Sequence, residues 1–259
     1  MKRFTSVDKS LRSAIKAYLV FCGKYGLRNI NPRAHHRVTV HPTLGLMYNR
    51  IKKNANTTVV GLLRELETGE LGHHRTAKKS SKRINDLSYE EAEGIWNYSL
   101  FTVIRNPYSR VLSAFLDKFR FDDYRQRYGS FSLTPEGFRD FITWLEDGGL
   151  TKDAHWDLQN KLMILPIDHY DRIVRLETFE QDMISLLQSR GITFDTTRLL
   201  GSHPTDQQKQ TSSNSRLRLF YCKGIAERVA DLYQKDFAAL KYTTEFPESL
   251  PHSAGKSGL

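Results

Sequence analysis

The sequence predicts an α/β domain in which a mainly parallel central sheet is flanked by helices. Three short apolar stretches, each followed by a helical pattern, carry this prediction. The chain has 259 residues, of which 39% are hydrophobic and 11% aromatic. This is enough apolar material to bury a sizeable core, and it excludes disorder for the bulk of the chain. Strands that alternate with helices favour parallel pairing, because two parallel strands need a crossover connection between them.

The first strand and helix come early in the chain. The apolar run Leu44–Tyr48 predicts a short strand, and a loop containing Asn54 and Asn56 follows it. After Thr57, hydrophobic residues recur at the spacing of one helix face. They are Val59, Val60, Leu62, Leu63 and Leu66.

The second unit is a strand over Tyr98–Arg105 and a helix that begins at Asn106-Pro107, because proline suits the first turn of a helix. Its apolar stripe comprises Tyr108, Val111, Leu112, Phe115 and Phe119. The third unit is a strand over Asp171–Leu176 and a helix over Phe179–Ser189 closed by Gly191. A long amphipathic helix is expected over Leu217–Leu240.

The charge is concentrated near the N-terminus. The net charge is +10, and residues 1–40 hold nine Lys and Arg but one Asp. We therefore expect a basic, partly helical segment over 1–40, the main domain over 41–248 and a flexible tail over 249–259. Two isolated cysteines and no apolar run of membrane-spanning length indicate a cytoplasmic protein. The basic segment predicts peripheral contact with an anionic membrane.

The loop from Ile51 to Thr58 follows the first strand and suits a phosphate or sulfate group. Amides at a helix N-terminus donate hydrogen bonds, Thr57 and Thr58 add hydroxyls, and Lys53 adds a positive charge. No GxxxxGK[ST] pattern is present, which disfavours an ordinary nucleotide kinase. The same residues would also fit a simple helix cap beside solvated lysines.

The loop after the second strand is also suited to an anion. Arg105 stands at the strand's carboxyl end, and Ser113 lies two turns into the next helix, so together they can hold one phosphate from two sides. Ligands of parallel sheets bind at the carboxyl ends of the strands. Two such loops predict a ligand with phosphates at both ends. Arg-x-Pro is also common before helices that bind no ligand, so neither loop alone identifies the site.

The stretch FTVIRNPYSRVLSAFLDKFR, Phe101–Arg120, resembles the 3′-phosphate-binding motif of the Golgi-type carbohydrate sulfotransferases, which include the chondroitin 4- and heparan sulfate 2-O-sulfotransferases. IKKNANTTV, Ile51–Val59, is similar to their 5′-phosphosulfate loop. Ala154-His155-Trp156 and YDRIVRLETFEQDM, Tyr170–Met183, follow in the family's order. The resemblance covers about residues 44–245. It implies a soluble member of the bacterial type with the family's P-loop-like fold.

The resemblance also implies the donor 3′-phosphoadenosine 5′-phosphosulfate, abbreviated PAPS. No metal is expected, because a lysine and a base suffice for the transfer and the histidines show no HExxH or similar ligand spacing. The residues implied around the phosphosulfate are Lys53, Asn54, Asn56, Thr57 and Thr58, with Lys53 also catalytic. Arg105 and Ser113 would hold the 3′-phosphate. Lys52 stands where the family usually has proline, so the loop gains a charge that could compete with Lys53 for the sulfate.

The acceptor hydroxyl needs a base, and a histidine titrates in the right range. His74 ranks first, because His74-Arg75-Thr76-Ala77 reproduces a His-x-Thr-Ala setting of the family; His155 ranks second and His73 third. Glu177 is a further candidate for orienting the substrate, and an ion pair with Arg175 explains it equally well.

The resemblance predicts transfer of a sulfuryl group to a carbohydrate or glycolipid hydroxyl by in-line displacement. The alternative is a non-catalytic protein that binds nucleic acid or anionic polysaccharide through its basic surface. Nucleic acid is not expected, because the densest basic cluster, His73–Arg83, contains no aromatic residue for base stacking. A nucleotide kinase with an unusual loop is a third reading, and it predicts magnesium dependence.

Overall fold

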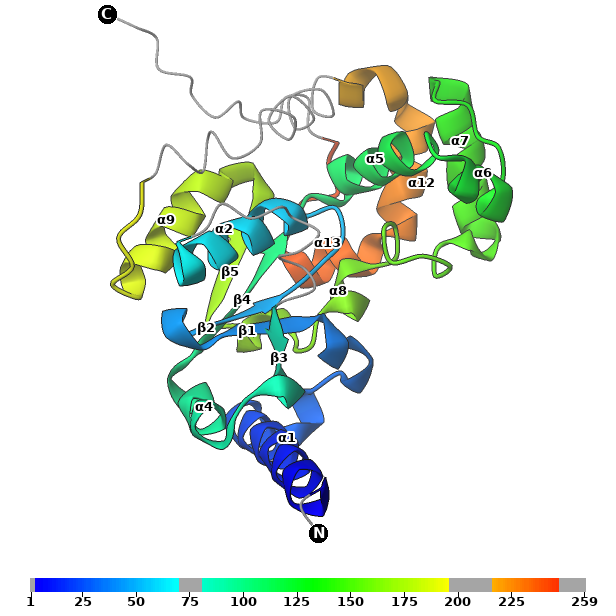
Figure 1. Cartoon of the computed structure of the whole chain (residues 1–259). Coiled ribbons are helices and arrows are strands. Elements are labelled where there is room, and N and C mark those ends of the chain that lie inside the picture. Colours follow the sequence, from blue (N-terminus) through cyan, green and yellow to red (C-terminus); the bar gives the residue numbers. More distant parts are fainter. Residues whose placement is uncertain (1–2, 70–80, 196–215, 247–259) are drawn as a thin grey trace, which may run out of the picture.

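The computed structural model describes residues 3–69, 81–195 and 216–246 (Figure 1). Five strands form one sheet in the order β3-β1-β2-β4-β5. The strands β2 (Leu46–Asn49), β4 (Ser99–Ile104) and β5 (Arg172–Arg175) are parallel, with Tyr48 opposite Phe101 and Val103 opposite Val174. The strands β1 (Val38–His41) and β3 (Lys82–Arg83) extend the sheet with antiparallel pairings. The predicted α/β fold is confirmed, and the antiparallel edge is an addition to it.

The three predicted pairs of strand and helix are confirmed. The helices α2 (Asn56–Thr68), α5 (Pro107–Lys118) and α9 (Phe179–Ser189) follow β2, β4 and β5. The prediction of one helix over Leu217–Leu240 is wrong. Residues 216–220 are helical, and α12 (Lys223–Leu232) and α13 (Gln234–Leu240) are separate helices. The helices are interrupted at Tyr221–Cys222 and at Tyr233, whose buried hydroxyl donates to the Trp156 carbonyl at 2.6 Å.

Both faces of the sheet are covered, so neighbouring strand residues enter different parts of the core. Tyr48 and Phe101 pack with residues of α2 and α9 on one face. Met47 and Leu100 pack on the other face with α1 (Arg3–Tyr25) and the segment 162–165. This arrangement explains why these strands have apolar runs rather than an alternating pattern. In Figure 1, α2 and α9 lie together on one side of the strands, and α1 lies beyond β1 and β3.

The N-terminal part of the chain joins the same core. Ala17, Phe21 and Tyr25 of α1 are buried, and α1 packs on α4 (Tyr89–Gly94). β1 belongs to the central sheet, and the expected boundaries at 40 and 248 stay predictions; the expected tail lies outside the described residues. Across the described parts of the chain, no helix is long and apolar enough to span a membrane.

A group of helices at one end of the sheet forms a second core, which is mostly aromatic. It comprises α5, α6 (Asp122–Tyr128), α7 (Pro135–Trp144) and α12, and it contains Phe115, Phe119, Phe138, Phe141 and Trp156. A π-helical turn (Leu145–Gly149) and α8 (Gln159–Leu162) lead back toward the sheet. The remaining 3₁₀ turns are Leu27–Asn29, Pro32–Arg37, Pro42–Leu44, Ile84–Asp86, Ile95–Asn97, Ile167–His169 and Leu176–Thr178.

Candidate active site

The loop between β2 and α2 has an unusual backbone. Lys53 and Ala55 both have positive φ, at 69° and 49°. Ala55 is the N-cap residue of α2, and it makes no side-chain cap bond. Left-handed residues at such positions form part of backbone nests that bind anions, and a helix N-terminus favours negative charge. The loop therefore offers backbone donors as well as the Lys53 ammonium.

Asn54 fixes this loop to the neighbouring strand. Its Nδ2 donates to the Val103 carbonyl at 2.8 Å and to Gln159 Oε1 at 2.7 Å. Its Oδ1 is buried with no hydrogen-bond partner, which leaves one acceptor in the loop unsatisfied. Asn56 accepts a hydrogen bond from Arg50 Nε at 3.2 Å. Asn54 and Asn56 thus have structural contacts of their own.

Arg105 joins the two predicted loops. Its guanidinium is buried, donates from Nε to Ser109 Oγ at 2.9 Å and donates from Nη1 to the Lys53 carbonyl at 3.1 Å. Burial lowers the pKa of Arg105 to about 10, although the Glu177 carboxylate acts in the opposite direction. The arginine therefore stays charged at neutral pH. A buried cation beside the Lys53 loop suits an anionic ligand.

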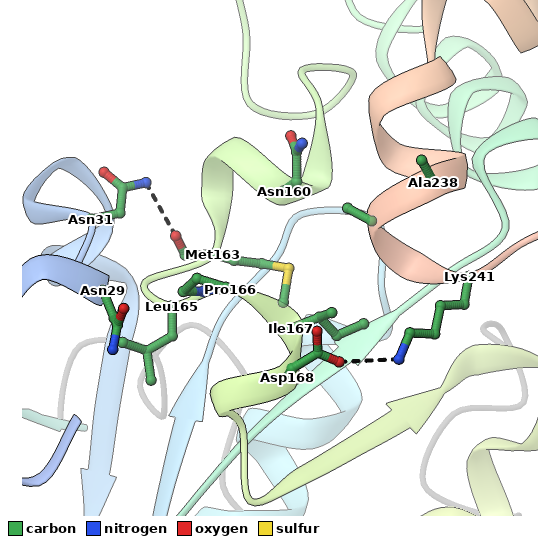
Figure 2. Close-up of a pocket in the computed structure, with 11 residues that line it drawn as sticks. Asn29, Asn31, Asn160, Met163, Leu165, Pro166, Ile167, Asp168, Ala238 and Lys241 are labelled. Carbon is green, nitrogen blue, oxygen red and sulfur yellow. Dashed lines mark hydrogen bonds and ion pairs between the residues drawn. The ribbon is translucent and has the colours of Figure 1, made fainter. Parts of the chain in front are cut away.

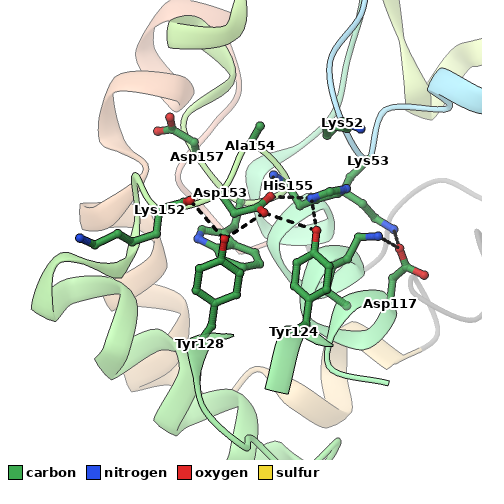
Figure 3. Close-up of polar contacts among 12 residues, drawn as sticks. Lys52, Lys53, Asp117, Tyr124, Tyr128, Lys152, Asp153, Ala154, His155 and Asp157 are labelled. Atoms are coloured by element: carbon green, nitrogen blue, oxygen red, sulfur yellow. Dashed lines mark hydrogen bonds and ion pairs between the residues drawn. The ribbon is translucent and has the colours of Figure 1, made fainter. Parts of the chain in front are cut away.

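Lys53 forms an ion pair with an acid on α5. Lys53 Nζ lies 2.9 Å from Asp117 Oδ2, and Lys118 Nζ lies 3.4 Å from the same oxygen (Figure 3). Burial lowers the pKa of Lys53 to about 8, and Asp117 only partly offsets this. Burial tends to raise the pKa of Asp117, but Lys53 and Lys118 lower it to about 2. Asp117 is thus a counter-ion that an anionic ligand would have to compete with.

His155 lies in a network of hydrogen bonds near the lysines. Its Nδ1 is 2.5 Å from Asp153 Oδ1 and 3.2 Å from the Tyr124 hydroxyl, and Tyr128 also donates to Asp153 (Figure 3). Burial opposes ionisation of Asp153, but the His155 hydrogen bonds lower its pKa to about 2. Because Asp153 is ionised, Nδ1 carries the proton, which leaves Nε2 as the basic nitrogen.

The pKa of His155 is lowered mainly by burial, with further contributions from Lys118 and Lys52. The histidine is therefore neutral at pH 7, as a proton acceptor must be. Lys118 and Lys52 act on this pKa because His155 lies near the Lys53 loop, as Figure 3 shows.

Arg110 connects the Lys53 loop to the His155 segment. Its buried guanidinium donates to three backbone carbonyls: Lys52 at 3.1 Å, Asp157 at 2.8 Å and Ala154 at 3.2 Å. The loop after β2 and the segment that carries His155 are therefore fixed relative to one another by a single side chain.

The structure brings together most of the predicted residues. Lys53, Asn54 and Arg105 meet as described, Asn56, Thr57 and Thr58 lie in the first turn of α2, and His155 lies across from the Lys53 loop. Ser113 is half-buried on α5. Ser109, one turn earlier on the same face, is the serine that Arg105 contacts. His73 and His74 lie outside the described residues, so the first-ranked base stays a prediction.

Several contacts were not anticipated from the sequence. The Gln159 carboxamide accepts from the Arg105 amide at 3.1 Å and donates to the Arg105 carbonyl at 2.8 Å. Glu177 accepts from the Asn106 amide at 2.8 Å and from the Tyr242 hydroxyl at 2.7 Å, which is a structural role. Among these residues and Asp117, the sequence signals only Asp117 as a neighbour of the predicted site. It lies four residues after Ser113 and so on the same helix face.

A separate cavity of about 480 Å³ lies between the Leu27–Asn29 turn, α8 and α13 (Figure 2). Met163, Leu165 and Ile167 form part of its lining, and an ion pair between Asp168 and Lys241 closes one side. None of the predicted site residues lines it. The candidate active site is therefore defined by its charged side chains and backbone geometry rather than by this cavity.

A model of the sulfotransferase family matches residues 36–243, which include both loops, Arg110 and the Asp153–His155 pair. The chain belongs to the sulfotransferase family. Carbohydrate sulfotransferase 9 of Homo sapiens is 23% identical over 264 residues, which cover 87% of this chain and 58% of that protein. Carbohydrate sulfotransferase 8 of Homo sapiens is 24% identical over 285 residues, which cover 95% of this chain and 66% of that protein.

This sulfotransferase chain thus spans about three fifths to two thirds of the length of those curated relatives. Carbohydrate sulfotransferase 8 of Mus musculus is similar at 22% identity. No solved structure gives a significant match.

Proposed function

We propose that this chain transfers a sulfuryl group from PAPS to a hydroxyl of a carbohydrate. The observation that carries the proposal is the junction of two loops at the carboxyl ends of neighbouring parallel strands, where Arg105 Nη1 donates to the Lys53 carbonyl at 3.1 Å. Membership of the sulfotransferase family and the carbohydrate sulfotransferase relatives support it.

The residues present fit a ligand with phosphate and sulfate groups. Hydrogen-bond donors come from the Lys53 ammonium, the Arg105 guanidinium and the backbone amides in the first turn of α2. The two side chains are positively charged. Bound PAPS would supply an activated sulfuryl group and a 5′-phosphate as its leaving group. Lys53 and the α2 amides would hold the phosphosulfate end, and Arg105 with Ser113 the 3′-phosphate.

Lys53 places positive charge where negative charge develops as the leaving group departs. With a pKa of about 8, Lys53 is mostly protonated at pH 7, so it can supply that charge. It must first leave Asp117, which holds it at 2.9 Å. Asp117 then still neutralises Lys118, 3.4 Å away.

His155 takes up the acceptor hydroxyl's proton at Nε2. Asp153 accepts the hydrogen bond from Nδ1, which fixes the ring and stabilises the imidazolium that forms. Arg110 keeps the histidine at a constant position relative to the Lys53 loop. His74 remains the alternative base.

Calorimetric titration with 3′-phosphoadenosine 5′-phosphate, beside ATP and AMP, tests the nucleotide site. We expect the bisphosphate to bind and the two controls to bind far more weakly. Ser113→Ala should weaken binding of the bisphosphate, and this variant leaves the bonds from Arg105 to Ser109 and Lys53 in place. Equal binding of all three nucleotides would contradict the proposal and favour a general polyanion binder.

Asp153→Asn tests the assignment of the base. If His155 is the base, this variant should lower kcat about 10²-fold or more, because the wrong tautomer is favoured, and leave nucleotide affinity unchanged. The Tyr128→Phe variant is the matched control, since it removes a different hydrogen bond to Asp153. Unchanged kcat in Asp153→Asn would transfer the role of base to His74.

A further inference from the structure

The Gln159 side chain lies between the two loops of the candidate site, and the proposed transfer gives it no role. It is fully buried, as is Asn54 of the first loop. Its Oε1 accepts hydrogen bonds from Asn54 Nδ2 at 2.7 Å and from the Arg105 amide at 3.1 Å. Its Nε2 donates to the Arg105 carbonyl at 2.8 Å. One carboxamide thus bonds to both loops.

The two bonds to Arg105 are made to its backbone rather than to its guanidinium. Arg105 directly follows β4, and the carboxamide engages its amide and its carbonyl together. The guanidinium therefore extends from a backbone position that Gln159 holds, and it donates to Ser109 and to the Lys53 carbonyl. In the proposed function this guanidinium binds the 3′-phosphate, whereas the loop that contains Asn54 binds the phosphosulfate end.

Gln159 is itself bonded to α13. Asp236 Oδ2 accepts from the Gln159 amide at 2.7 Å, and Asp236 Oδ1 accepts from the Asn160 amide at 2.9 Å. Asp236 is fully buried, and α8 lies beside α13 in Figure 1. In this structure the backbone of Gln159 is therefore bonded to α13, while its side chain is bonded to both loops.

A ligand with anionic groups at both ends depends on the separation of the two loops. Once one end is bound, the contact at the other end is intramolecular, and it adds affinity only where the two sites match the length of the ligand. The bonds of Gln159 to Asn54 and Arg105 act on that separation, together with the bond from Arg105 Nη1 to the Lys53 carbonyl at 3.1 Å. A ligand with a single phosphate does not depend on it.

We infer that Gln159 is a positioning residue that sets the separation of the two loops and so makes the site selective for a nucleotide with anionic groups at both its 3′ and its 5′ position. This inference rests on the proposed function and adds a specificity-determining residue to it. Because its side chain is fully buried, Gln159 acts through Asn54 and Arg105 rather than by contact with the nucleotide.

Calorimetric titration with three nucleotides tests the inference. They are 3′-phosphoadenosine 5′-phosphate and the two adenosine monophosphates with the phosphate at the 5′ or at the 3′ position. The variant is Gln159→Met, because methionine is similarly unbranched but lacks the carboxamide. We expect its affinity for the bisphosphate to fall at least about ten-fold, with both monophosphate affinities within about three-fold of the wild type. In sulfation assays, KM for PAPS should rise by a similar factor, while kcat at saturating PAPS stays within about three-fold.

Asn54→Ala breaks the same connection from the side of the first loop, so it tests the inference even if Gln159→Met does not fold. It should show the same selective loss, and the double variant should lose little more than the larger single loss. The matched control is Asn49→Leu, which removes another fully buried carboxamide. In the described structure the Asn49 side chain bonds to residues of the segment 162–170, so this variant should bind all three nucleotides as the wild type does.

A loss of similar size for the bisphosphate and both monophosphates in the Gln159 and Asn54 variants would overturn the inference, because the carboxamide would then only support the local structure. Unchanged bisphosphate affinity in these variants, or a selective loss in Asn49→Leu, would overturn it as well. A wild-type protein that binds the bisphosphate no better than the monophosphates would refute the proposed function, and this inference with it. The two failures are therefore distinguishable from the wild-type titrations.

Discussion

The junction between β2 and α2 and the junction between β4 and α5 have the same topology but different internal bonding. The first has two left-handed residues, Lys53 and Ala55, and no side-chain cap. In the second, Asn106 caps the helix by accepting from the Tyr108 amide at 3.0 Å, and Pro107 occupies the first helical position. The first junction retains backbone donors for an anion, whereas the second satisfies its own backbone and contributes a side chain, Arg105.

Because of this difference, we expect the first junction to contribute mainly to ligand binding and the second to contribute to stability as well. A loop whose strain is maintained by its surroundings is typical of a functional site. The capped junction holds a buried guanidinium in place, so its contribution to ligand binding is also a contribution to stability. Loss of the Lys53 charge in the first junction should therefore affect the reaction, and loss of the Asn106 cap in the second should affect folding.

The largest effect is expected for Lys53→Ala in the first junction. Loss of the charge on the leaving group should lower kcat by about 10² to 10³-fold, since removal of one preorganised donor has that effect in other enzymes. Steady-state kinetics with saturating donor measure it, and Lys52→Ala is the neighbouring control with the same change in charge. A Lys52→Ala variant that loses as much kcat as Lys53→Ala would break the distinction between the two lysines.

The pH profile of kcat/KM should be bell-shaped. If His155 is the base, it must be neutral, and burial lowers its pKa below the ordinary range of histidine, so activity should rise with pH on the acid side. Protonated Lys53 is needed too, and its pKa is about 8, so activity declines above that pH. Lys53→Arg should remove the alkaline limb, because arginine stays protonated. An alkaline limb that persists in Lys53→Arg would assign that limb to another group.

Asn106→Ala tests the second junction. Loss of the cap should lower the free energy of unfolding by about 1 kcal/mol, measured by chemical denaturation. The nucleotide affinity of the folded protein should change little, because Arg105 keeps its bonds to Ser109 and Lys53. If affinity falls while stability is unchanged, Asn106 acts on the ligand and the contrast between the junctions is wrong.

The smallest effect is expected for Ala55→Gly. Ala55 has a φ of 49°, where a side chain is unfavourable, so glycine should raise the free energy of unfolding by about 0.5 to 1 kcal/mol. Gly61→Ala, inside the same helix, is a control for the reverse substitution in ordinary helical backbone. A loss of stability in Ala55→Gly would mean that the loop is not strained at this residue.

The sequence predicted the parts of the fold that depend on local patterns. The strands, the helices that follow them and the loops carrying Lys53 and Arg105 are signalled by apolar runs, by proline at a first turn and by charge at a strand end. The antiparallel pairing of β1 and β3 depends on contacts between distant segments, and β3 has only two residues. The residues of β1 and β3 therefore have no local sequence pattern that would predict this pairing.

The candidate site was predicted less completely. Lys53 and Arg105 were identified through their motifs, but Gln159 reaches them from a segment whose own pattern says nothing about charge or binding. Asp117 shares a helix face with Ser113, but its pairing with Lys53 depends on the fold. The amphipathic stripe over Leu217–Leu240 carried no signal for the break at Tyr233. At that residue the structure shows a buried contact with Trp156, which lies 77 residues away and leaves no trace in the local pattern.

Arg110 has a mechanical consequence. Its guanidinium joins three carbonyls from two separate segments and lies buried between them. These bonds hold the Lys53 loop and the segment that carries His155 at a fixed separation in this structure. On the proposed mechanism, the scaffold therefore sets the distance between the Lys53 loop and His155, and the surface around them can vary with the acceptor without changing that distance.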